Sequence, residues 1–143
     1  KNELSENFDL FIFGPSAFDE QTCRVNKNSA PSCSGPRLGL VLKTTNSKAI
    51  ASATRLWEKT MAADLKPLVL AKTSGGTPNF QTGTYKGVTI RYKNLPSPAI
   101  TVEYAVVGDK LIISTSKASI LKAIDLLPDE TAVPETPGTV PNE

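Results

Sequence analysis

The residues of this sequence that could carry chemistry most directly are its two cysteines, Cys23 and Cys33, in the stretch CRVNKNSAPSC. A zinc site needs about four Cys, His or carboxylate ligands. The chain has no histidine, and Asp19 and Glu20 match no ligand spacing. A thioredoxin-like redox pair would have the spacing C-x-x-C beside a βαβ unit, and Cys23 and Cys33 do not have this spacing. The pattern therefore favours a structural disulfide, with two unrelated free thiols as the alternative, and it predicts neither a metal site nor a cofactor.

The other candidates for chemistry are serine–lysine pairs and scattered acids. Without histidine, Ser–His–Asp and Cys–His arrangements are excluded within this chain. The pairs Ser47–Lys48 and Ser116–Lys117 begin predicted helices, where serine is favoured as an N-cap and adjacent side chains do not face each other. Asp109 is explained by its preference for a turn. We therefore expect no catalytic residues and no enzymatic activity.

The cysteine pair also bears on the location of the protein. Over so short a loop a disulfide would contribute roughly 2–3 kcal/mol, chiefly by restricting the unfolded chain. Disulfides persist in oxidising compartments, so we expect an extracytoplasmic protein, on the cell surface, on the periplasmic side or secreted. The sequence has no transmembrane or signal-peptide pattern and begins at Lys1, so any membrane anchor is expected outside it.

Charge is unevenly distributed along the chain. The net charge is +2, from 16 Lys and Arg against 14 Asp and Glu, and five of the acids lie in residues 125–143. Residues 1–124 therefore carry a net charge of +7. This charge suits an anionic partner, or the lysines merely solvate the surface. Residues 128–143, PDETAVPETPGTVPNE, are expected to be a disordered Pro/Thr/Glu-rich tail or linker after a single domain over residues 1–127.

The elements that would position these residues begin with two strands and a helix. Apolar residues run through 7–14 and 38–42, and these strands are expected to form a wide hairpin across the cysteine loop. After them the apolar period becomes that of a helix, with Asn46 or Thr45 as its N-cap. Trp57 lies on the apolar stripe of this helix and is interpreted as a core residue.

The second half of the sequence predicts three strands and another helix. The strands cover 88–93, 100–106 and 111–113, with a two-residue turn at Gly108–Asp109, and a helix follows at 116–127. The fold class is therefore α+β in the order β-β-α-β-β-β-α. The economical architecture is a single, largely antiparallel sheet of about five strands with both helices packed on one face.

Such packing would leave the second face of the sheet open to solvent or to a partner. Thr89, Arg91, Lys93, Thr101 and Glu103 are expected on that face, where Arg91 and Glu103 could form a weak surface pair. The residues assigned to possible interaction surfaces are Arg91, Tyr92 and Lys93 on the sheet and Asn26 and Asn28 on the loop that Cys23 and Cys33 would close.

Three motifs between residues 84 and 125 resemble a known family. They are a Y-x-G-V-x-I strand, a strand that ends in a G-D turn, and a strand L-x-I-[SG]-T-S that leads into a helix. The matching residues are Tyr85, Gly87, Val88, Ile90, Gly108, Asp109, Leu111, Ile113, Thr115 and Ser116. With the strand–helix unit before them, residues 38–127 resemble an uncharacterised bacterial extracytoplasmic family of unknown function. The resemblance implies an outward-facing α+β domain behind a membrane anchor, and it implies no activity or site residue.

The hypothesis from the sequence is a non-enzymatic extracytoplasmic module for protein interaction, adhesion or envelope organisation. Its expected partner is a protein or an envelope polymer, not a nucleic acid, and it would meet the membrane only through an anchor outside this chain. Two alternatives stay open. One is an enzyme, or an enzyme-regulating domain, whose site forms with a partner; the other is a binder of an anionic envelope polymer, whose binding would weaken steeply with salt.

Overall fold

The computed structural model describes residues 4–14, 37–65, 67, 79–95 and 100–127. The strands are β1 (Leu4–Phe13), β2 (Arg37–Thr44), β3 (Gln81–Tyr85), β4 (Val88–Asn94), β5 (Thr101–Val107) and β6 (Lys110–Ser114). The helices are α3 (Ser47–Trp57), α4 (Met61–Asp64) and α6 (Lys117–Leu126). The predicted cysteine loop at 23–33 and the predicted tail at 128–143 lie outside the described residues.

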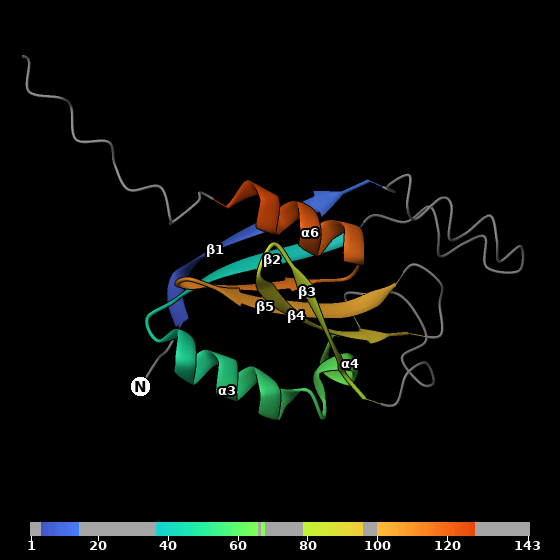
Figure 1. Ribbon diagram of the computed structural model, residues 1–143, viewed down its shortest axis with the longest axis horizontal. Coiled ribbons are helices and arrows are strands. Elements are labelled where there is room, and N and C mark those ends of the chain that lie inside the picture. The colour runs from blue at the N-terminus through green and yellow to red at the C-terminus, as the bar shows by residue number, and fades with distance from the viewer. Residues whose placement is uncertain (1–3, 15–36, 66, 68–78, 96–99, 128–143) are drawn as a thin grey trace, which may run out of the picture.

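The six strands form one antiparallel sheet in the order β1-β2-β6-β5-β4-β3 (Figure 1). The prediction of an α+β fold with a single antiparallel sheet is thereby confirmed. The N-terminal hairpin β1–β2 joins the rest of the sheet through the pairing of β2 with β6. At one end of this pairing Leu38 donates its N–H to Thr115 Oγ1 (2.9 Å) and accepts the Thr115 N–H (3.0 Å). Segments that are far apart in the sequence therefore meet in the middle of the sheet.

Two tight turns connect the strands of the C-terminal half. The predicted turn at Gly108–Asp109 is confirmed and joins β5 to β6, with φ of 54° at Gly108. Lys86 and Gly87, with φ of 48° and 78°, join β3 to β4 in the same way. Positive φ at these positions suits the twist of a two-residue hairpin and favours glycine. The sequence does not predict β3, because QTGTY has no apolar alternation and contains a glycine.

Helices cover both faces of the sheet, with α3 and α4 on one face and α6 on the other (Figure 1). Buried residues on the α3 face are Ile50, Met61, Ala62, Phe80, Leu95, Ile100, Val102, Tyr104, Leu111 and Ile113. Those on the α6 face are Ile90, Ala105, Ile112, Ile120, Ala123 and Ile124. The expectation that both helices pack on one face is therefore wrong.

The reason is that the central strands are apolar on both sides. Ile112 and Ile113 are neighbours in β6, and each is buried in the core of a different face. A strand of this kind needs cover on both faces. Arg91 lies opposite Tyr104 on the α3 face, whereas Glu103 is buried on the α6 face. The predicted open face and the predicted Arg91–Glu103 pair are therefore wrong as well.

Both long helices begin at the caps that the sequence predicts. The Asn46 side chain accepts a hydrogen bond from the Ala49 N–H (3.0 Å) at the start of α3. Ser116 does the same for the Ser119 N–H (3.2 Å) at the start of α6. Each cap satisfies a backbone donor that the helix itself leaves unpaired, so the two helix starts are fixed by local sequence.

The contact between Phe11 and Gly39 fixes how β1 lies on β2. The two residues are directly opposite each other, and the Phe11 ring occupies the space that a side chain at position 39 would need. Any larger residue at this position must displace the ring or the strand. The absence of a Cβ at Gly39 is thus a packing requirement of the first hairpin.

We predict that Gly39→Ala destabilises the domain by roughly 1–3 kcal/mol, because overpacking forces side chains and backbone to shift. Gly83→Ala is the matched control, since a Cβ there meets only the edge of the Tyr92 ring at 3.5 Å, an ordinary contact. Urea denaturation followed by circular dichroism measures both variants. Equal stability of Gly39→Ala and the unmodified protein would contradict the packing described here.

Candidate functional site

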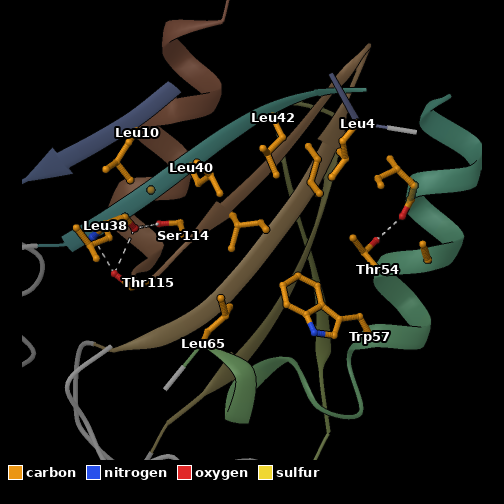
Figure 2. Close-up of a pocket in the computed structure, with 15 residues that line it drawn as sticks. Leu4, Leu10, Leu38, Leu40, Leu42, Thr54, Trp57, Leu65, Ser114 and Thr115 are labelled. Atoms are coloured by element: carbon orange, nitrogen blue, oxygen red, sulfur yellow. Dashed lines mark hydrogen bonds between the residues drawn. The ribbon is translucent and has the colours of Figure 1, made fainter. Parts of the chain in front are cut away.

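An apolar groove of about 500 Å³ lies between α3 and the sheet, over β1 and β2 (Figure 2). It exists because α3 packs mainly on β5 and β6 and leaves the neighbouring part of β2 only partly covered. The apolar side chains that line it are Leu4, Leu10, Leu38, Leu40, Leu42, Ile50, Ala53, Trp57, Leu65, Leu111 and Ile113. Its volume falls within the ~300–1,000 Å³ typical of small-molecule sites.

Three hydroxyl-bearing residues also line the groove, and each is directed at the backbone of the protein itself. Thr54 Oγ1 donates to the Ile50 carbonyl (2.9 Å). Ser114 lies opposite Glu103, so its side chain is on the α6 face, where Oγ donates to the Ser116 carbonyl (3.2 Å). Thr115 Oγ1 accepts the Leu38 N–H. None of the lining residues is titratable. Because an unpaired polar group is costly in such surroundings, the lining favours a ligand segment without polar atoms.

Trp57 forms one wall of the groove from the last turn of α3 (Figure 2). Its indole N–H donates to Asp64 Oδ2 (2.6 Å), and the Thr60 hydroxyl donates to the same oxygen (2.8 Å). These hydrogen bonds, that of Trp57 first, lower the pKa of the Asp64 carboxyl. Trp57 is partly buried and packs against the α3-face core, so the sequence interpretation of Trp57 as a core residue holds only in part. Its second role, as a wall of a cavity, is not visible in the sequence.

A charged cluster holds the C-terminal end of α3 against the sheet. Arg91 donates from Nε and Nη2 to the two oxygens of Glu58, at 2.8 and 2.7 Å, and Tyr104 donates its hydroxyl to Glu58 Oε1 (2.7 Å). The paired side chains are only 12% and 16% exposed. The hydrogen bond from Arg91 is the main cause that lowers the pKa of Glu58. Burial, and then the bond to Glu58, raise the pKa of Tyr104 to about 12.

The residues assigned to an interaction surface from the sequence are not gathered into one site among the described residues. Arg91 is engaged with Glu58 on the α3 face, and Lys93 is half-buried on the same face by strand alternation. Tyr92 is half-buried and lies on the α6 face, opposite Glu103. Asn26 and Asn28, like Cys23 and Cys33, lie outside the described residues.

The α6 face holds one buried acid, Glu103, which is 3% exposed. It lies opposite Ser114 on β6 and opposite Tyr92 on β4, and the Thr101 hydroxyl donates to its Oε1 (2.7 Å). Burial raises the pKa of Glu103 to about 7, although the bond from Thr101 and the charge of Lys117 act to lower it. Glu103 does not line the groove.

Within the described part of the chain, no group of three or more His, Cys, Asp or Glu could hold a metal ion. No helix there is long and apolar enough to cross a membrane. No protein-family model matches the chain, and no curated protein and no solved structure matches it either.

Glu103 gives a prediction about stability and pH. An unfolded Glu ionises near 4.5, whereas Glu103 stays protonated up to about pH 7 in the folded protein. The free energy of unfolding should therefore fall by roughly 3 kcal/mol as pH rises from about 4.5 to about 7. Glu103→Gln removes this pH-dependent loss and keeps an acceptor for Thr101. Urea titrations at several pH values measure the difference between the variant and the unmodified protein.

Glu58→Gln is the control for the direction of this effect. The pKa of Glu58 is lowered, so its contribution to stability is present above about pH 4.5 and is lost as pH falls through the folded pKa. The two substitutions should therefore change the pH dependence in opposite directions. If Glu103→Gln does not change how the free energy of unfolding varies between pH 4.5 and 7, the raised pKa of Glu103 is contradicted.

Proposed function

We propose that this domain is a non-enzymatic binding module that acts outside the cytoplasm, in envelope organisation, and that its groove takes up the alkyl chain of a single lipid molecule. The observation that carries the proposal is a groove of about 500 Å³ in which every wall is apolar and every lining hydroxyl is directed at the backbone. An alkyl chain is the ligand segment that leaves no polar group unpaired there.

The groove supports binding more than catalysis. A general acid or base has to reach the substrate with a titratable group, and the lining residues carry none. The acid with a strongly raised pKa, Glu103, lies on the other face of the sheet. A polypeptide ligand is less well suited than an alkyl chain, because its backbone N–H and C=O groups would enter the groove without partners.

The test is a binding titration with saturated fatty acids of increasing length, each below its micellar concentration, followed by the fluorescence of Trp57. Trp57 is the sole tryptophan of the sequence and forms a groove wall, so its emission reports on the site. We expect saturable binding whose affinity rises roughly fourfold per methylene until the groove is filled, from about 0.8 kcal/mol per buried CH₂.

Two variants of α3 provide the matched comparison. Ala53→Phe places a ring in the groove and should weaken binding by about tenfold or more, whereas Ser52→Phe places the same ring at an exposed position that does not line it. Affinity that does not depend on chain length, but falls steeply with salt, would instead support the alternative of an anionic polymer bound by the basic body. Equal binding by Ala53→Phe would also overturn the proposal.

The location outside the cytoplasm rests on the predicted bond between Cys23 and Cys33. The intact mass of the natively produced protein, alkylated under denaturing conditions with and without prior reduction, tests it directly. We expect alkylation of these cysteines only after reduction. Alkylation of both thiols without reduction would remove the argument for an oxidising compartment and, with it, the support for the family resemblance.

A further inference from the structure

β1 forms one edge of the sheet and carries a row of exposed apolar side chains. Phe8, Leu10 and Ile12 are 61%, 61% and 66% exposed and alternate along the strand. Leu10 lines the groove, so the row lies on the α3 face and continues the apolar surface of the groove to the edge of the sheet. Large hydrophobic side chains in a contiguous exposed row indicate a surface that binds another molecule.

The same three residues direct their backbone groups away from the sheet. Leu38 of β2 turns both its N–H and its C=O towards Thr115, on the β6 side. In an antiparallel ladder alternate residues face alternate neighbours, so Gly39 and Val41 are the residues that face β1. Their partners Phe11 and Asp9 use their backbone groups within the sheet. Phe8, Leu10 and Ile12 therefore present theirs at the outer edge, where no described residue pairs with them.

The opposite edge of the sheet is built differently. β3 is half as long as β1, and its sequence QTGTY exposes polar side chains and contains a glycine. Short, polar edges resist pairing with another chain, whereas a long apolar edge invites it. An association through this sheet is therefore expected at β1 and not at β3.

We propose that two copies of this chain pair through β1, antiparallel and centred on Leu10, to form one continuous sheet. The alternation of Phe8, Leu10 and Ile12 is symmetric about Leu10, which suits the isologous interface of a two-fold dimer. Leu10 would face the partner's Leu10, and Phe8 would face the partner's Ile12. On the α6 face Asp9 would lie opposite the partner's Phe11, so like charges are not brought together.

The size of this surface sets the strength of the dimer. Phe8, Leu10 and Ile12 are each about three-fifths exposed, and together the two copies would bury roughly 600 Å² of their surface in the dimer. Stable interfaces bury about 1,200 Å² or more, so the contact is expected to be reversible and to depend on concentration. Hydrogen bonds between the two β1 edges would fix the orientation of the strands, since each facing pair of outward-directed residues exchanges two of them. The dimer would also join the two grooves across Leu10 into one apolar surface.

Sedimentation velocity of the full chain, from low to high micromolar concentration, tests the proposal. We expect a monomer–dimer equilibrium. Ile12→Lys should raise the dissociation constant of the dimer at least tenfold, because a charged side chain blocks edge pairing. Thr84→Lys, an exposed position on β3, is the matched control and should dimerise as the unmodified protein does. A monomer at all concentrations, oligomers larger than a dimer, or unchanged dimerisation of Ile12→Lys would each overturn the proposal.

Amide hydrogen exchange measured by NMR tests the orientation independently. The amides of Phe8, Leu10 and Ile12 should gain protection as concentration rises, while those of Asp9 and Phe11 are protected throughout. Dimerisation without this alternation would overturn pairing through β1. Phe8 and Ile12 do not line the groove, so lipid binding by Ile12→Lys remains measurable, and failure of the dimer is distinguishable from failure of the binding function.

Discussion

The bidentate ion pair between Glu58 and Arg91 is the interaction on which the candidate site depends. It ties the residue that ends α3 to β4, and Tyr104 of β5 adds a third hydrogen bond to the same carboxylate. Side chains this enclosed hold each other firmly, because separating them would leave a charge without a partner away from water. With its end held over β4 and β5, α3 covers β1 and β2 only in part. The groove is therefore a consequence of where the helix is anchored.

The two faces of the sheet differ in how completely they are filled. On the α6 face the helix packs on β2, β5 and β6, and the Phe11 ring lies over Gly39. On the α3 face the helix packs mainly on β5 and β6, and the leucines of β2 beside it stay only partly buried. The groove proposed to bind an alkyl chain and the edge proposed to pair with a second copy both adjoin this second face. They are proposed on separate observations, the lining of the groove and the direction of backbone groups on β1.

Much of the fold could be predicted from the sequence, and the reasons for the failures are specific. The apolar period of α3, the caps Asn46 and Ser116 and the Gly108–Asp109 turn are local signals, and all are present. The faces could not be assigned, because Glu103 is a charged residue type and its burial depends on neighbours from β4 and β6. An arginine in an alternating strand indicates a solvent-exposed face. The partner that allows Arg91 to be enclosed, Glu58, is distant in the sequence and cannot be recognised there. The groove has no signal of its own: its lining residues are the leucines and isoleucines of an ordinary core, and the cavity arises from the placement of α3.

The pairing of β2 with β6 has a consequence for how the chain folds. Leu38 and Thr115 are 77 positions apart, so β2 cannot find its second neighbour until nearly the whole domain has been synthesised. Contacts of such separation slow folding, because a long loop has to close before they form. Until then the leucines of β2 and the apolar row of β1 stay without cover on the nascent chain. The interval between the synthesis of β2 and that of β6 is therefore the period in which this domain is most exposed to misassembly and would depend most on a chaperone.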